Sequence, residues 1–343
     1  MSDDTTPRPL PNAARPAGPE PPNRRDFLRR AATAGLTLAG AGVLAWGLAD
    51  AKGPGPDEGR QASFTPPSYA LAPAAPALAI VHSRDRVAAA RAGLEALGGL
   101  ARFISPGDQV VVKVNAAFAS PPALGATTQP DLVAEVVRLC LAAGAAQVVV
   151  TDNPINDPQS CFELSGIGPA ATRAGARVML PRPEMFRPAT LPGGRLIKNW
   201  PFLWRPLAGA QKLIGLAPVK DHHRSGASLS MKNWYGLLGG QRAVFHQDIG
   251  NIIKELALLI SPTLVILDGV TSMISNGPTG GSPSDLAPTH TLVVSTDQVA
   301  ADAVGAELLG RRPADLPFLP LAAAAGAGTL DYRSLSPRMV DLG

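Results

Sequence analysis

Two stretches decide the fold: residues 109–115, which read Q-V-V-V-K-V-N, and residues 130–153, which read P-D-L-V-A-E-V-V-R-L-C-L-A-A-G-A-A-Q-V-V-V-T-D-N. The nearly continuous valine run of the first is typical of a strand buried on both faces of a parallel sheet. Pro130 suits the first turn of a helix, and Gly144 suits its C-terminal end. A second valine strand follows at 147–151. The unit predicts two parallel strands joined by a right-handed helical crossover.

Strand and helix patterns alternate on either side of this unit. Further strands are predicted at 78–82, 177–180, 212–219, 263–268 and 291–296, and further helices at 84–103, 160–174, 228–238, 248–259 and 298–309. The alternation predicts an α/β fold with a largely parallel sheet and helices on both faces, arranged as one body or as two lobes.

Composition sets the expected domain boundaries. Residues 52–76 are rich in proline and glycine and are predicted to form a linker. Residues 77–343 are predicted to form a single α/β domain. Within that domain the Pro- and Trp-rich stretch 181–211 is expected to be an irregular insertion, such as a flap.

The chain of 343 residues is 45% hydrophobic and 17% charged, which is enough apolar material for a sizeable core. Aromatic residues make up only 5%, so aliphatic side chains must supply most of the buried surface. The formal net charge is +4, and no basic run is interleaved with aromatic residues. We therefore expect no nucleic-acid partner.

The two cysteines, Cys140 and Cys161, are too few to ligate an iron–sulfur cluster on their own, and no C-x-x-C pair occurs. Cys140 lies in the apolar pattern of the helix 130–143, which favours a buried thiol. A disulfide between the two cysteines stays open, because the sequence does not supply its geometry.

The N-terminal residues 1–51 are predicted to be a disordered start followed by an export signal. Arg24-Arg25, then Phe27, precede the uncharged stretch 31–49, and a small-x-small pattern ends at Ala51. This order resembles a twin-arginine (Tat) signal peptide. We expect the Tat translocase as a partner during export, cleavage after Ala51 and a periplasmic protein. An uncleaved membrane anchor is the alternative.

Polar side chains recur where the predicted strands end. Lys113 and Asn115 close one strand, Asp152 closes the next, and Lys220 follows a later one. Ligands of open parallel sheets bind beyond the carboxyl ends of the strands. The segment 219–251 also holds three of the five histidines. Clustered polar groups need partners when they lose water, so the sequence predicts a ligand site at this edge.

Lysine and amide side chains in these places fit an anionic ligand. The ligand-binding candidates are Lys113, Asn115, Asp152, Lys220, Lys232, Asn233 and Asn276. Glycine pairs at 239–240 and 280–281 add backbone N–H groups suited to an anion. The alternative is ordinary capping and turn formation, since no P-loop or G-x-G-x-x-G fingerprint occurs.

Histidine and aspartate side chains of the same segment offer nitrogen and oxygen ligands for a divalent metal such as zinc or iron. The metal candidates are Asp221, His222, His246 and Asp248. Against this, adjacent histidines usually point in different directions, and no H-E-x-x-H pair occurs. The alternative is local hydrogen bonding and solvation. The sequence names no cofactor.

An ordered series of motifs runs through the chain. It comprises V-V-V-K-V-N (110–115), A-T-T-Q-P-D-L-V (126–133), T-D-N-P (151–154), A-P-V-K-D-H-H (217–223), S-M-K-N-W-Y-G-L-L-G-G (230–240), N-G-P-T-G-G (276–281) and S-T-D-Q-V-A-A-D-A-V-G (295–305). Together they resemble the bacterial and archaeal family labelled domain of unknown function 362. The family name implies no general activity. Many members carry a ferredoxin-like module with cluster-ligating cysteines, which this chain lacks.

Two functional hypotheses follow. In the first, the exported protein binds a metal or an anionic ligand in a cleft at the carboxyl ends of the strands, with or without catalysis. In the second, it is a non-catalytic accessory or maturation subunit of an exported redox system. That hypothesis predicts a membrane or iron–sulfur redox protein as partner, in contact with the stretch 181–211. The residues identify no substrate, reaction or oligomeric state.

Overall fold

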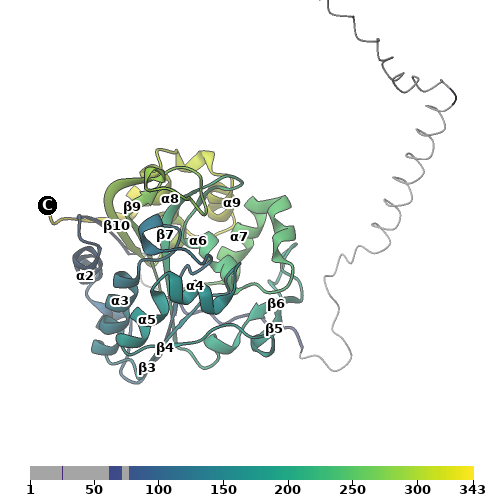
Figure 1. The fold of residues 1–343 in the computed structure, drawn as a ribbon, viewed down its shortest axis with the longest axis horizontal. Helices are drawn as coiled ribbons and strands as arrows, with labels where there is room; N and C mark the ends of the chain where they lie inside the picture. Colours follow the sequence, from purple (N-terminus) through teal and green to yellow (C-terminus); the bar gives the residue numbers. More distant parts are fainter. Residues whose placement is uncertain (1–24, 26–61, 72–76) are drawn as a thin grey trace, which may run out of the picture. The chain divides into compact units, whose positions relative to one another are not determined.

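A mixed sheet runs through the centre of the protein, which the computed structural model describes at residue 25 and over residues 62–71 and 77–343 (Figure 1). In pairing order its strands are β11 (Arg338–Asp341), β1 (Leu78–His82), β10 (Leu286–Ser295), β9 (Leu264–Met273), β7 (Lys212–His222), β2 (Gln109–Lys113), β3 (Gln147–Thr151) and β4 (Arg177–Val178), with β8 (Gly226–Ser228) beside β7. Strands β9, β7, β2, β3 and β4 run parallel, whereas β10 and β8 are antiparallel to their neighbours. The predicted α/β fold with a largely parallel sheet is confirmed.

Helices cover both faces of the sheet, as predicted. One face packs against α2 (Arg86–Ala96), α3 (Pro130–Ala142), α4 (Pro158–Leu164) and α5 (Ile167–Arg173), and the other against α6 (Ser230–Asn233), α7 (Ile249–Leu259), α8 (Gln298–Leu308) and α9 (Phe318–Ala324). Along β2, Val110 and Val112 face the first group, while Val111 faces the second. This burial on both sides explains why the valine run is continuous.

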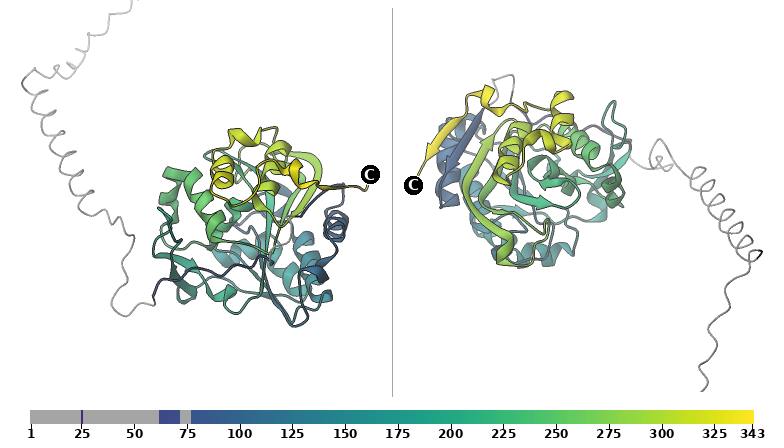
Figure 2. Two further views of the ribbon diagram at one scale, coloured as in Figure 1. Left: turned by 180° about the vertical axis from the view of Figure 1, so that it is seen from behind. Right: turned by 90° about the horizontal axis from the view of Figure 1, so that it is seen from above.

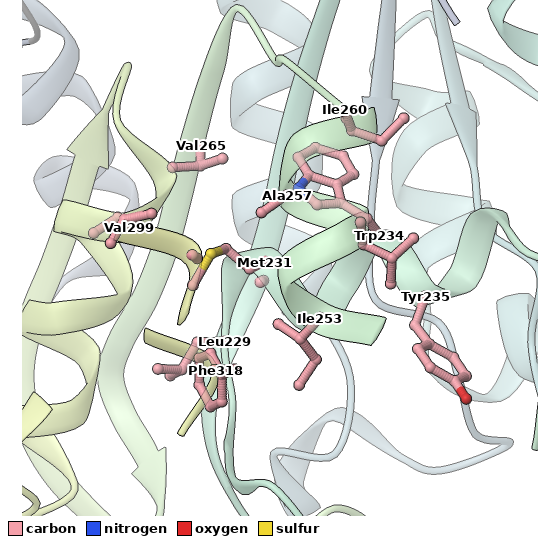
Figure 3. Packing of buried hydrophobic residues seen from close by; sticks show 14 of the residues in the cluster. Leu229, Met231, Trp234, Tyr235, Ile253, Ala257, Ile260, Val265, Val299 and Phe318 are labelled. Atoms are coloured by element: carbon pink, nitrogen blue, oxygen red, sulfur yellow. The ribbon is translucent and has the colours of Figure 1, made fainter. Parts of the chain in front are cut away.

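The core on the second face gathers around Trp234, which is fully buried (Figure 3). Its indole packs over β7 at Gly215, where an added Cβ would come within 2.6 Å of the ring. The indole Nε1 donates to Gln298 Oε1 at 2.7 Å, which ties this part of the chain to α8. Trp234 therefore serves as a packing residue that fixes the position of α6.

The order of the parallel strands reverses between β2 and β7. From β2 the chain moves outward to β3 and β4, and it then returns to the other side of β2 to form β7 and β9. The carboxyl ends of β2 and β7 therefore flank a crevice, which is the usual ligand position in an open α/β sheet.

Glycines divide two of the predicted helices. The helix predicted at 84–103 ends at Ala96, because Gly98 and Gly99 adopt positive φ angles of 98° and 75°. The helix predicted at 160–174 is split into α4 and α5 by Gly166, whose φ is 72°. The third difference is a shorter α6, which passes into a 3-10 turn at Trp234–Leu237.

Strands β7, β9 and β10 are longer than predicted, because antiparallel partners extend their ladders. Strand β7 continues to His222 by pairing Lys220 with Ser228 of β8. Strand β9 continues to Met273 beside β10. Polar residues predicted to follow a strand, such as Lys220, thus lie within one, and Asp268 lies inside β9 instead of at its end.

The stretch 181–211, predicted to be irregular, contains a hairpin of β5 (Phe186–Ala189) and β6 (Trp200–Leu203). The loop that joins the two strands is held by the buried carboxylate of Glu255 in α7. That carboxylate accepts hydrogen bonds from the backbone N–H groups of residues 195–197 at 2.7–3.1 Å.

Strand β11, which the sequence analysis does not predict, pairs in parallel with β1 at the edge of the sheet (Figure 2).

The export signal 1–51, with its cleavage after Ala51, and most of the linker 52–76 lie outside the described residues. Among the described residues, no helix is long and apolar enough to cross a membrane. Cys140 and Cys161 are both buried free thiols.

Candidate functional site

A cavity of about 1240 Å³ lies at the crevice between β2 and β7. The cavity is lined by residues far apart in the sequence. They include Lys113, Asn115, Phe118, Asp152, Arg182, Phe186, Lys220, His222, His223, Lys232, Asn233, Tyr235, Gly236, Arg242, His246 and Asn276. The cavity thus brings together polar residues from several strand ends, from α6 and from the loop between β9 and β10.

A buried ion pair forms one wall of the cavity. Lys113 Nζ lies 2.8 Å from Asp152 Oδ1, and the two residues are 1% and 2% exposed. The same carboxylate accepts from the backbone N–H groups of Ala116 at 2.7 Å and Asn153 at 2.9 Å. The carboxylate is therefore satisfied by a cation and two backbone donors, as a buried charge requires.

Amide side chains connect this ion pair to Lys220. Lys113 Nζ donates to Asn233 Oδ1 at 2.8 Å, and Asn115 Nδ2 reaches the same oxygen at 3.4 Å. Lys220 Nζ in turn donates to Asn115 Oδ1 at 3.4 Å and to the Ala126 carbonyl at 2.5 Å. One hydrogen-bonded network therefore spans both sides of the crevice.

Gly236 allows the ion pair to sit against the 3-10 turn after α6. A Cβ at this position would lie 2.7 Å from Lys113 Nζ and even closer to Asp152 Oδ1. The carbonyl of Gly236 also accepts from the Asn153 N–H at 2.9 Å. No larger residue fits here without displacing the ion pair.

The start of α6 is anchored by Asp302 of α8. Its carboxylate accepts from the backbone N–H of Ser230 at 2.7 Å, from that of Met231 at 3.0 Å and from the Ser230 hydroxyl. Asp302 is fully buried. These hydrogen bonds satisfy the free N–H groups at the start of the short helix that carries Lys232 and Asn233, and they hold it against α8.

Lys232 extends into the cavity without a hydrogen-bond acceptor or carboxylate partner among the described residues. Its ammonium lies 5.3 Å from the centre of the Tyr235 ring. Burial lowers the pKa of Lys232 to about 8, and the charges of Arg242 and Lys113 act in the same direction. Burial, with Lys232 next in effect, lowers the pKa of Lys220 to about 7.

Arg242 adds a further cation and holds the cavity wall together. Its guanidinium donates to four backbone carbonyls: those of Tyr235, Leu238, Asn153 and Pro154, at 2.7–3.0 Å. Burial lowers the pKa of Arg242. The sequence analysis missed this residue. Its position inside the segment 219–251 was the available signal, but nothing in that segment indicates which arginine turns inward.

Three imidazoles stack along the cavity. The ring centroids of His222 and His223 are 5.0 Å apart, with an angle of 9° between the ring planes. The centroids of His222 and His246 are 6.1 Å apart, with an interplanar angle of 13°. His222 Nδ1 accepts from the backbone N–H groups of Arg224 and Ser225, which leaves the ring hydrogen on Nε2. Burial, aided by the Lys232 charge, lowers the pKa of His222 to about 2, so this ring is neutral.

The proposed set of four metal ligands is not assembled. Asp221 pairs with Arg311 and accepts from the Gly277 N–H, while Asp248 pairs with Arg195. Neither aspartate lines the cavity. Alternation along β7 explains Asp221, because it points away from the face that carries Lys220 and His222. Within the part of the chain that the structure describes, no three His, Cys, Asp or Glu side chains form a metal-binding group.

Asn276 reaches the cavity rim from the loop between β9 and β10. Its side-chain nitrogen already donates to Asp285 Oδ1 at 2.6 Å, so the residue shapes the loop. Asp268 lies outside the cavity and pairs with Arg86 at 3.1 Å. The stretch 181–211 contributes part of the cavity wall through Pro181, Arg182 and Phe186.

The protein is an α/β protein with a cavity, lined in part by charged and amide side chains, at the point where its strand order reverses. The family model described as domain of unknown function (DUF362) matches residues 110–307, which is more than half of the chain. The chain belongs to this family, as the motifs indicate.

Among similar proteins is a thylakoid-associated protein of Synechocystis sp., 28% identical over 246 residues, which cover 68% of this chain and 73% of that protein. Two solved structures are distant neighbours, each at 12% identity. The lactate racemase apoprotein from Thermoanaerobacterium thermosaccharolyticum has a TM-score of 0.37 and covers 67% of this chain. A protein from Thermotoga maritima has a TM-score of 0.34 and covers 71%. The chain spans 56% and 59% of these two solved chains.

Proposed function

We propose that the cavity binds a small anionic ligand, such as a carboxylate or a phosphate compound. The main support for this proposal is the excess of positive charge among the described residues that line the cavity. The lining contains one carboxylate, Asp152, which already pairs with Lys113. It contains six basic side chains: Lys113, Lys220, Lys232, Arg182, Arg224 and Arg242. Crowded cations in a partly desolvated site repel one another, and an anion relieves that repulsion.

Lys232 is the residue best placed to contact the anion directly. Lys113, Lys220 and Arg242 already donate to protein oxygens, whereas Lys232 has no acceptor among the described residues. The neutral His222, with its hydrogen on Nε2, offers a second donor at the same cavity. The arrangement supports recognition of an acidic group by one ammonium and one imidazole N–H.

The proposal is tested by titrating the full chain with succinate in a calorimeter. We expect Lys232→Gln to weaken binding at least about tenfold, because a hydrogen bond to a charged group is worth about 1.5–3 kcal/mol. Lys254→Gln is the matched control, since Lys254 bonds to Asn251 in α7 and does not line the cavity. Equal affinity in the protein and both variants, or no binding to any of them, would refute the anion site.

Binding is also expected to weaken as pH rises from about 7 to about 8. In the free protein the pKa of Lys220 is about 7 and that of Lys232 is about 8. Below this window both amines carry a charge. Above it, anion binding must first take up protons, which lowers the observed affinity. Calorimetry in buffers of different ionisation enthalpy would detect this proton uptake.

We also propose that the protein is exported by the twin-arginine pathway. The support is sequence alone, since Arg24-Arg25 and the stretch 31–49 precede the small residues up to Ala51. Contact with a membrane or iron–sulfur redox protein stays a prediction.

Export is tested by fractionating cells that produce the tagged full chain. Replacing both Arg24 and Arg25 by lysine should retain the precursor in the cytoplasm, because the pathway reads the arginine pair and not its charge. The control replaces Arg29 and Arg30 by lysine, which makes the same change of residue type just outside the pair. Equal amounts of both proteins in the periplasm would contradict export by this route.

A further inference from the structure

We infer that Lys232 forms an imine with the carbonyl carbon of an anionic keto or aldehyde compound. This inference rests on the proposed anion site and adds a chemical step to it. The inference is based on an amine that lines a large cavity, lies over the Tyr235 ring and has neither a hydrogen bond nor a salt bridge among the described residues.

The three lysines of the cavity differ in how far their amines are already committed. Lys113 Nζ is held by Asp152, by Asn233 Oδ1 and by the Val114 carbonyl, at 2.7–2.8 Å, so its hydrogens are already engaged by protein oxygens. Lys220 is 1% exposed and donates to Ala126 and Asn115. Lys232 is only partly buried, and it has neither a salt bridge nor a hydrogen bond among the described residues. It is the amine that a ligand can reach.

The surroundings of Lys232 make its uncharged form, which is the nucleophile, easier to reach near neutral pH than in an ordinary lysine. Burial together with the Arg242 and Lys113 charges brings the pKa of Lys232 down to about 8. Desolvation and a neighbouring cation are the two means by which proteins activate a lysine for attack on a carbonyl. Asp152 does not counteract this effect at Lys232, because its oxygens are taken by Lys113 and two backbone N–H groups.

The reaction is a balanced condensation. The Lys232 Nζ lone pair attacks the carbonyl carbon, a C–N bond forms, and the carbonyl oxygen takes up a proton. In total the two hydrogens of the amine end on this oxygen, the C–O bond breaks to release one water molecule, and a C=N bond forms. No oxidant or reductant takes part.

Two neighbouring rings suit the proton movements of this reaction. His222 carries a hydrogen on Nε2, through which it can donate a hydrogen bond to the carbonyl oxygen while keeping the proton. His246 lies beside it, and its Nδ1 is 3.3 Å from the Tyr235 hydroxyl. Burial lowers the pKa of His246, so this ring is a neutral acceptor for the proton that the amine loses.

The experiment incubates the full chain with 2-oxobutyrate and borohydride, which reduces an imine to a stable secondary amine. Intact mass and peptide mapping should show one adduct, located at Lys232. Butyrate, which has the same chain and charge but no ketone, should give none. Lys232→Met should lose the adduct, and Lys254→Met, which alters a lysine outside the cavity, should keep it.

Lys232→Arg covers the case in which the methionine variant fails to fold, because it keeps the cation and cannot form an imine. It should bind butyrate in a thermal-shift assay and give no adduct. An adduct at Lys220 or only at lysines outside the cavity would overturn the inference. Binding of both acids without any adduct would overturn the imine and leave the anion site intact. Failure of both acids to bind would overturn the proposed function itself.

Discussion

Replacing Gly236 by alanine is expected to lower the free energy of unfolding by about 3–5 kcal/mol, the cost of breaking a buried ion pair. The added methyl group would lie 2.7 Å from Lys113 Nζ and closer still to Asp152 Oδ1, so one of the two charged groups must move. A buried charge without its partner is strongly unfavourable. Urea unfolding followed by circular dichroism measures the change.

Gly281→Ala is the control for this substitution, since a Cβ there meets nothing within 4 Å and the backbone does not have a positive φ. It should change the free energy of unfolding by less than about 1 kcal/mol. If both alanine variants unfolded at the same urea concentration as the unaltered protein, the close approach of Gly236 to the ion pair would be wrong.

The second large loss in the free energy of unfolding is expected when either partner of the Lys113–Asp152 pair is neutralised. Lys113→Met leaves the carboxylate with only backbone donors, and Asp152→Asn leaves an ammonium ion that is 1% exposed. Each single variant should lose about 3–5 kcal/mol in the same urea assay. The double variant should lose clearly less than the sum of the two, because it leaves no unpaired charge.

An exposed ion pair provides the comparison. Arg312 and Asp315 pair at 2.9 Å with side chains that are 83% and 51% exposed. Arg312→Met should therefore cost less than about 1 kcal/mol. Additive losses at Lys113 and Asp152, equal in size to the loss at Arg312, would show that the two buried groups do not interact.

Much of the architecture follows from local pattern. The valine strands 109–115 and 147–151 and the helix from Pro130 lie close to their predicted places, because side-chain periodicity is a local property. The extension of β7 to His222 and of β9 to Met273 depends on strands paired from elsewhere in the chain. Such tertiary pairing leaves no local mark, so the sequence could not reveal it.

The candidate site was predictable in part for a related reason. Lys113, Asn115 and Asp152 follow valine strands, so their place at the carboxyl edge of a parallel sheet could be read from the order of residues. The direction in which a side chain points could not be predicted from the order of residues. Asp221 differs from Lys220 by one position and points to the other face, while Arg242 enters the cavity from a 3-10 turn that has no clear periodicity.

The length of β7 has a consequence for the thermodynamics of any ligand. Lys220 is paired with both β8 and β9, and His222 is paired with β8, so their backbone is ordered when the chain folds. Association then need not immobilise a loop to bring these groups into place, and less conformational entropy is lost on binding. At the proposed anion site, ligand recognition would therefore depend on groups that the sheet holds in place, with the β5–β6 hairpin and the loop 276–279 as further parts of the lining.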